Sequence, residues 1–178
     1  AKYPAYNLIL GGEQEEMMEF LRGAIIAGVT AILLIAIILV SLFKSYTQPI
    51  FVMAVIPFSI VGVYIGLFIN NTPIGVLPIM GMVALMGVVV NDSLVLVSFV
   101  NKLRREGKSK LEALVEAGKI RLRPIILTTV TTIVGLIPMS YGLMGAESFL
   151  QPMGIAIIFG LFFATTITLF ILPCMYYI

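Results

Sequence analysis

The chain has 178 residues, of which 60% are hydrophobic and 11% are charged, with 11 Lys and Arg against 9 Asp and Glu. Soluble domains carry about 25% charged residues, so this composition excludes an ordinary soluble protein and predicts an integral membrane protein. There is no His and one Cys, which excludes a histidine-based proton relay and an internal disulfide. Because the chain begins at Ala1 without a Met or a signal-peptide pattern, we expect it to be excised from a longer polypeptide.

The first 22 residues precede the apolar segments. Residues 4–11 are typical of the end of a strand, which cannot fold alone and therefore implies a further domain. Acidic residues follow, and they suit the first turns of a helix because the helix dipole favours negative charge there. We interpret them as solvated helix-end residues rather than an ion-binding ring: Glu13, Glu15, Glu16 and Glu19.

Five segments are long and apolar enough to cross a bilayer, which takes about 20 residues. They cover residues 23–43, 49–69, 76–100, 124–143 and 153–177. Some prolines stand at or just before the expected helix starts, where a missing N–H is harmless: Pro49, Pro124 and Pro152. Others predict kinks inside helices or near their ends: Pro57, Pro78, Pro138 and Pro173. Small residues four apart predict close helix crossings at two places: Gly62 with Gly66, and Gly160 with Ala164.

Positive charge is unevenly distributed among the connections. Residues 101–123 hold eight Lys and Arg against three Glu, and residues 44–48 add Lys44, whereas 70–75 and 144–152 hold no Lys or Arg. The positive-inside rule therefore places the N-terminus outside and the C-terminus in the cytoplasm. Residues 109–120, beginning with a Ser109–Glu112 capping box, predict a short cytoplasmic interfacial helix. The expected fold is an all-α membrane protein with a five-helix transmembrane bundle.

Asp92 is the only acidic residue inside the long apolar segments, and no Lys or Arg lies at membrane depth. A carboxylate near the bilayer centre costs about 2.5–3.5 kcal/mol on insertion scales. Asp92 must therefore be protonated or paired with a cation from elsewhere. Both states indicate a proton-coupled machine.

Polar side chains accompany Asp92 on two neighbouring spans. Asn91 is adjacent to it, and the fourth span carries one helical stripe of small polar and glycine residues: Thr128, Thr131, Thr132 and Gly135. At about 1.5 Å per residue, Asp92 and Thr132 both lie about 12 Å from the cytoplasmic ends of their helices. We predict a proton relay of Asp92, Asn91, Thr128 and Thr132; the alternative for the threonines is interhelical hydrogen bonding alone. The ten Met are more typical of packing than of metal transfer, and neither a metal nor a cofactor site is expected.

Three stretches together resemble resistance-nodulation-division (RND) transporters of the hydrophobe/amphiphile efflux type. They are residues 11–16 with the span that ends at 42–46, residues 87–99, and residues 121–129. The chain is similar to the last five helices of a transporter with two six-helix halves, about twelve helices in all. The resemblance implies that residues 1–22 end an extracytoplasmic porter domain and residues 23–178 form the transmembrane bundle. It also places Thr128 at the family's threonine position on the proton path.

The family implies export driven by the proton-motive force, by substrate/proton antiport across the inner membrane. The implied partners are the N-terminal half, two further copies in a homotrimer, a periplasmic adaptor, an outer-membrane channel, lipids and protons. Neither enzyme activity nor nucleic acid is implied. Well-known multidrug members carry Lys and Asn at the positions of Asn91 and Asp92, so their lysine–aspartate pair does not transfer; we expect a hydrogen-bonded carboxylate cluster that shares a proton across the halves. Heavy-metal or lipid export, or a non-transporting membrane scaffold, are the alternatives.

Overall fold

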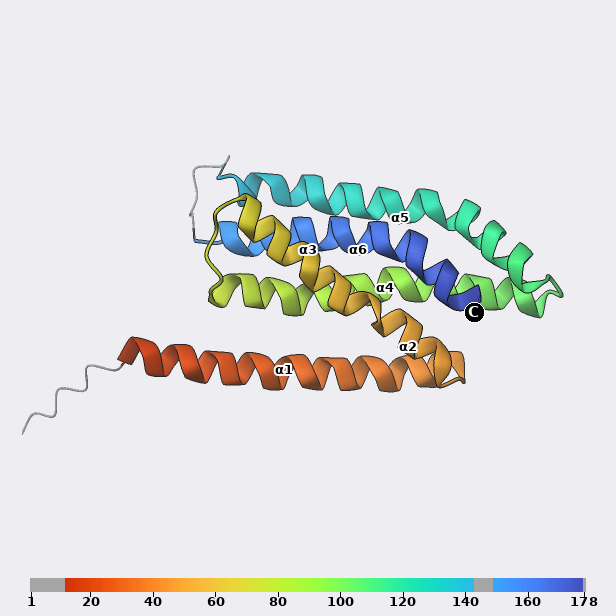
Figure 1. Ribbon diagram of the computed structural model, residues 1–178, viewed down its shortest axis with the longest axis horizontal. Coiled ribbons are helices and arrows are strands. Elements are labelled where there is room, and N and C mark those ends of the chain that lie inside the picture. Colours follow the sequence, from red (N-terminus) through yellow and green to blue (C-terminus); the bar gives the residue numbers. More distant parts are fainter. Residues whose placement is uncertain (1–11, 143–148, 178) are drawn as a thin grey trace, which may run out of the picture.

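The computed structural model describes residues 12–142 and 149–177, and the strand expected at residues 4–11 lies outside this range. The described chain is helical, with no strand in these two segments. Its helices are α1 (Gly12–Phe43), α2 (Thr47–Met53), α3 (Val55–Ile69), α4 (Val76–Arg105), α5 (Lys110–Ser140) and α6 (Gln151–Tyr177) (Figure 1).

Five helical segments are long and apolar enough to cross a membrane: Glu15–Phe43, Thr47–Ile69, Val76–Arg105, Lys110–Ser140 and Gln151–Phe170. The second of them joins α2 and α3. This result confirms the five predicted spans and the all-α class. The helix that holds the first span begins at Gly12, so the four glutamates at residues 13–19 lie in its first turns, as predicted.

Helix α6 is the centre of the bundle. It contacts α2, α3, α4 and α5, whereas α1 contacts only α2 and α4 among the described helices and runs along one side of the bundle (Figure 1). The core is formed by apolar side chains from several helices, which include Leu39, Val63, Leu67, Leu85, Val97, Ile155 and Leu161. Most large side chains of α1 are exposed, as expected for a helix whose other sides face lipid or another part of the protein.

Glycines set the close approach of α3 and α6. A Cβ atom added at Gly62 would lie 2.3 Å from the Cβ of Phe163, and one added at Gly66 would lie 2.3 Å from the Cβ of Phe159. Gly160 is covered by Leu85 and Val63 side chains, which a Cβ would meet at 2.2 and 2.7 Å. The close crossings predicted from the small-residue spacings are therefore confirmed.

The break between α2 and α3 follows from Pro57. Proline has no N–H to donate to the carbonyl of Met53, so the hydrogen-bond ladder is interrupted at the point where α2 ends. The amide of Ala54, at the junction, still donates to the carbonyl of Ile50 at 2.9 Å, so the two helices continue as one bent span. The kink predicted at Pro57 is confirmed.

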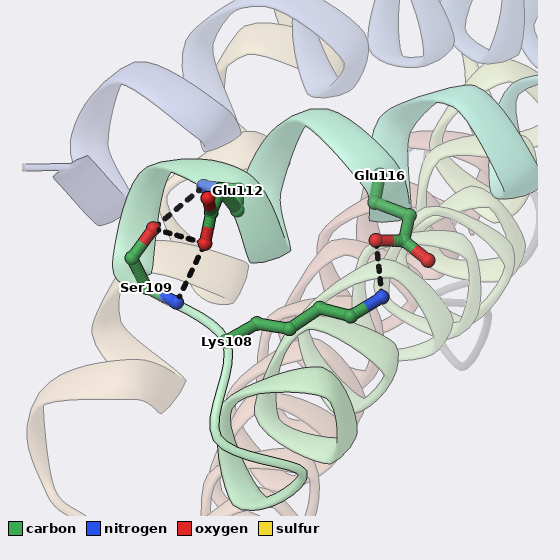
Figure 2. Close-up of polar contacts among 4 residues, drawn as sticks. All are labelled: Lys108, Ser109, Glu112 and Glu116. Atoms are coloured by element: carbon green, nitrogen blue, oxygen red, sulfur yellow. Dashed lines mark hydrogen bonds and ion pairs between the residues drawn. The ribbon is translucent and has the colours of Figure 1, made fainter.

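The turn from α4 to α5 contains Gly107 at φ +92° and ends in a capping box at Ser109. The Glu112 amide donates to Ser109 Oγ at 3.3 Å, and Glu112 Oε2 accepts from the Ser109 amide at 3.1 Å (Figure 2). Lys108 makes an ion pair with Glu116 across the same turn (Figure 2). The predicted capping box is confirmed, and it fixes where α5 begins.

The separate interfacial helix predicted at residues 109–120 is not formed. Residues 110–140 make one continuous helix, α5, with Pro124 inside it rather than at a helix start. One proline removes a single hydrogen bond, here to the carbonyl of Ile120, and the helix continues past it. The residues before Pro124 are Arg121, Leu122 and Arg123, none of which is a good N-cap, so nothing in the sequence restarts a helix there.

Candidate functional site

Asp92 lies on α4, half-buried, at the contact with α6. It lines a gap with Val89 of its own helix and with one stripe of α6: Leu161, Ala164, Thr165 and Thr168. These four α6 positions follow the i, i+3, i+4, i+7 spacing of a single helix face. The gap is too narrow to hold a water molecule, so any polar partner of the carboxyl group inside it comes from α6.

The two threonines of this stripe are buried and already donate their hydroxyl hydrogens. Thr165 Oγ1 donates to the carbonyl of Leu161 at 2.8 Å, and Thr168 Oγ1 donates to the carbonyl of Ala164 at 2.8 Å. A hydroxyl group has one hydrogen and two lone pairs, so each threonine retains acceptor capacity. The two α6 threonines can therefore accept a further hydrogen bond. The carboxyl group of Asp92 can donate such a bond only when it is protonated.

A second hydroxyl contact ties α5 to the same stripe. Thr129 of α5 and Thr165 of α6 are both buried, and their Oγ1 atoms lie 2.9 Å apart. Because Thr165 donates to Leu161, Thr129 is the donor in this pair. Thr129 does not line the gap itself, but Thr165 links α5 to it.

The structure separates the other predicted relay residues from this gap. Asn91 and Thr128 are exposed, and Thr132 is partly exposed. Thr128 Oγ1 donates to the Ile125 carbonyl at 2.9 Å, and Thr132 Oγ1 donates to the Thr128 carbonyl at 2.8 Å. None of the three lines the gap beside Asp92. Their predicted roles depend on groups beyond the described helices.

The residues predicted from the sequence do not include the threonines that line the gap, Thr165 and Thr168, or Thr129, which is hydrogen-bonded to Thr165. Thr129 lies outside the predicted stripe of α5, which passes through its neighbour Thr128. A sequence feature that could have indicated the α6 threonines is the segment 164–168, where three of five residues inside an apolar span are threonine.

Within residues 12–142 and 149–177, no hydrogen bond or ion pair reaches the Asp92 carboxyl group. The ion pair seen in this part of the chain, Lys108–Glu116, lies at the α4–α5 turn. The same residues contain no group of three His, Cys, Asp or Glu side chains arranged to hold a metal ion. The polar side chains of the described chain that lie beside Asp92 are thus the neutral hydroxyl groups of Thr165 and Thr168.

A family model described as AcrB/AcrD/AcrF family matches residues 3–178. The chain belongs to this family. It is therefore part of the membrane portion of an RND efflux transporter, and not an enzyme. The family assignment agrees with the resemblance of residues 87–99 and 121–129 noted in the sequence.

Curated relatives include proteins named for multidrug resistance and for metal resistance. The chain is 34% identical over 167 residues to the swarming motility protein SwrC of Bacillus subtilis, and the match covers 93% of the chain. It is 31% identical to the multidrug resistance protein MdtC of Proteus mirabilis over 93% of the chain. It is also 31% identical to the cobalt-zinc-cadmium resistance protein CzcA of Cupriavidus metallidurans over 98% of the chain. The chain spans only 16% of SwrC and MdtC and 17% of CzcA.

A solved structure supports the same fold. The crystal structure of a heavy metal efflux pump superposes with a TM-score of 0.71 at 27% sequence identity. The match covers 82% of the chain and 14% of that pump. The helix arrangement in Figure 1 is thus that of part of an RND membrane domain, whereas the substrate class stays open between drugs and metals.

Proposed function

We propose that this chain forms the second-half membrane bundle of a transporter that exports amphiphilic or hydrophobic compounds in exchange for protons, and that Asp92 carries the proton. The observation that supports this proposal is the position of Asp92, half-buried against threonine hydroxyls of α6 with no cation partner among the described residues. A carboxyl group in that position stabilises no local structure by an ion pair. A function in proton transfer explains why the membrane span retains it.

The hydroxyl geometry supplies a two-state switch. In the proposed protonated state, the Asp92 side chain turns toward α6 and its O–H donates to Oγ1 of Thr165 or Thr168, a bond that the structure itself does not contain; the threonine hydrogens stay on the α6 carbonyls. When the proton leaves, the carboxylate needs donors, so a hydroxyl turns away from its carbonyl and donates to Asp92 instead. The two states favour different packing of α6 against α4, which couples proton release to a helix movement.

The remaining relay residues face outward in this proposal. Asn91 and Thr128 are exposed on α4 and α5, and Thr132 is partly exposed on α5. We assign these surfaces to the N-terminal half of the transporter, whose acidic groups share the proton with Asp92. The complete site then forms only where the two halves meet.

The proposed setting follows the charge distribution of the loops. Residues 101–123 carry an excess of positive charge, so this region faces the cytoplasm, the N-terminus lies outside, and the C-terminus lies inside. Residues 1–22 end a porter domain, and residues 23–178 form the inner-membrane bundle. A homotrimer, a periplasmic adaptor and an outer-membrane channel complete the proposed assembly.

Export of divalent metal ions is the second candidate function. It is favoured by the match to CzcA over 98% of the chain and by the likeness to the heavy metal efflux pump structure. Asp92 would drive either kind of export, since it acts on protons rather than on the exported compound. The substrate is therefore tested separately from the proton site.

The proposal is tested in cells that lack their own efflux pumps and express the full-length transporter. Retention of an amphiphilic dye and of Zn²⁺ is compared among the native protein, Asp92→Asn and Asp92→Glu. A matched control, Glu106→Gln, removes an exposed acid at the end of α4. We expect Asp92→Asn to retain dye like cells without a pump, Asp92→Glu to recover part of the export, and Glu106→Gln to behave as native. Export of Zn²⁺ but not of dye by the native protein would show that the exported substrate is a metal ion and not an amphiphile.

A further inference from the structure

A cleft of about 370 Å³ opens between the end of α1 and the last turns of α4. Its wall combines apolar side chains of Leu42, Phe43 and Leu94 with the cations Lys102 and Arg105. We propose that this cleft binds an anionic phospholipid, with the phosphodiester between the two cations and an acyl chain along the apolar side chains. This inference goes beyond the proposed transport function and does not depend on Asp92.

The order of side chains along α4 matches the order of groups in a phospholipid. The α4 positions that line the cleft share one helix face and run from Leu94 through Ser98 to Lys102 and Arg105. At about 1.5 Å per residue, Leu94 lies about 16 Å deeper than Arg105. The wall is therefore apolar toward the membrane interior and cationic at the helix end, which is the arrangement expected of a lipid headgroup site between transmembrane helices.

Both cations are available to a ligand. Lys102 and Arg105 are exposed, and within the described residues neither makes an ion pair or a hydrogen bond through its side chain. Lys108, three residues after Arg105, is instead neutralised by Glu116 (Figure 2). Glu106 follows Arg105 directly, but within the described residues it makes no ion pair with either cation, and unpaired arginine and lysine side chains are those that proteins use to hold a phosphate group.

The cleft has a rigid side because α4 is held in place behind it. Asn101 Nδ2 donates to Gln48 Oε1 of α2 at 2.6 Å, and Asn101 Oδ1 accepts from the Tyr176 hydroxyl of α6 at 2.6 Å. Asn101 itself lines the cleft, next to Lys102. This network fixes the register of the α4 end relative to α2 and α6, so the cations are presented on a preformed wall.

The apolar side of the cleft distinguishes a lipid from a free anion. Leu42 is 52% exposed at the end of α1, and Leu94 is partly buried beside it in the cleft. Inorganic phosphate would leave these side chains unused, whereas an acyl chain covers them.

The test uses the purified full-length transporter, and native mass spectrometry counts the phosphatidylglycerol and phosphatidylcholine molecules that each variant retains. The double variant Lys102→Gln/Arg105→Gln removes both cleft cations. The matched control, Arg104→Gln/Arg123→Gln, removes two exposed cations that do not line the cleft. We expect native protein and control to retain phosphatidylglycerol, and the cleft variant to lose affinity for it by about tenfold or more.

Three results would overturn the proposal. Equal loss in the control would mean a diffuse attraction of anionic lipid to the basic loop. Displacement of the lipid by inorganic phosphate would mean a site for free anions. Retention of the two lipids in equal numbers by the native protein would mean that the cleft has no headgroup preference, and this comparison needs no variant to fold.

Discussion

Thr129 of α5 donates a hydrogen bond to Thr165 of α6 across a buried distance of 2.9 Å. Thr165 also lines the gap beside Asp92, so this single hydroxyl is shared between the packing of α5 on α6 and the surroundings of the carboxyl group. A movement of α5 relative to α6 would change the hydrogen bonds of the Thr165 hydroxyl and therefore whether it can accept a hydrogen bond from Asp92. The pair thus joins helix packing to the proposed proton site.

Removing this hydrogen bond should loosen the α5–α6 contact by a modest amount. Interhelical hydrogen bonds in membranes contribute on average about 0.6 kcal/mol and at most about 1.7 kcal/mol. We expect a double-mutant cycle of Thr129→Val and Thr165→Val, measured by unfolding of the full-length transporter in detergent, to give a coupling energy in this range. Thr166→Val serves as a control because Thr166 is exposed and its hydroxyl bonds only within α6. A coupling of zero would show that the pair contributes nothing to packing.

Adding a methyl group at Gly66 should separate α3 from α6. The new Cβ would overlap the Cβ of Phe159, which cannot move without moving the backbone of α6. Overpacking of this kind costs about 1–3 kcal/mol, so Gly66→Ala should lower the unfolding temperature of the transporter. Gly23→Ala is the matched change, since a Cβ there meets nothing within 4 Å and alanine favours the helix. Equal stability of the two variants would contradict the close crossing.

Loss of the Asn101 side chain should be more damaging than loss of the Tyr176 hydroxyl. Asn101 Oδ1 accepts from both Gln48 and Tyr176, and its Nδ2 donates to Gln48, whereas Tyr176→Phe removes one donor to Asn101 and a long 3.5 Å contact with Gln48 Nε2. Each hydrogen bond contributes about 0.5–1.5 kcal/mol, so the loss of three bonds in Asn101→Ala should destabilise the transporter by about 1.5–4.5 kcal/mol, and Tyr176→Phe should destabilise it by less. Tyr46→Phe, at an 82% exposed tyrosine, should have no effect on thermal unfolding. A larger loss with Tyr176→Phe would contradict the central place of Asn101.

Ser109→Ala should fray the first turn of α5. The variant loses the acceptor for the Glu112 amide and the hydroxyl that donates to Glu112 Oε2 at 2.7 Å (Figure 2). An N-cap serine contributes about 1 kcal/mol, and that loss should appear as faster hydrogen exchange of the amides of residues 110–113. Lys119→Ala, on an exposed position of the same helix, should leave these rates unchanged. Unchanged rates in Ser109→Ala would show that the turn is held by other contacts.

The sequence was informative wherever a local physical rule applied. Apolar length predicted the five spans, side-chain chemistry predicted the capping box at Ser109, and the spacing of Gly62 and Gly66 predicted a close crossing. Each of these features depends on residues that are near one another along the chain. The resemblance to RND transporters was confirmed by the match over residues 3–178, whereas the hydrophobe/amphiphile type stays a prediction.

Features that depend on which helices become neighbours were harder to predict. The stripe through Thr128 and Thr132 was read correctly as one helix face, but the face of α5 that meets α6 carries Thr129, about 100° further round the helix. The continuity of α5 through Pro124 was missed because a proline interrupts one hydrogen bond without ending a helix whose flanks are strongly helical. Whether Thr128 and Thr132 join the proton path stays a prediction.

The most direct test of the proposed proton site is substrate-driven proton flux in vesicles that contain the full-length transporter, native or with Asp92→Asn. The substitution keeps the size of the side chain and removes its titratable proton. We predict that Asp92→Asn inserts normally and binds substrate but gives no substrate-driven flux, and that Thr168→Val at the same gap slows it. Native flux in Asp92→Asn would show that Asp92 is a structural group, with the proton carried elsewhere.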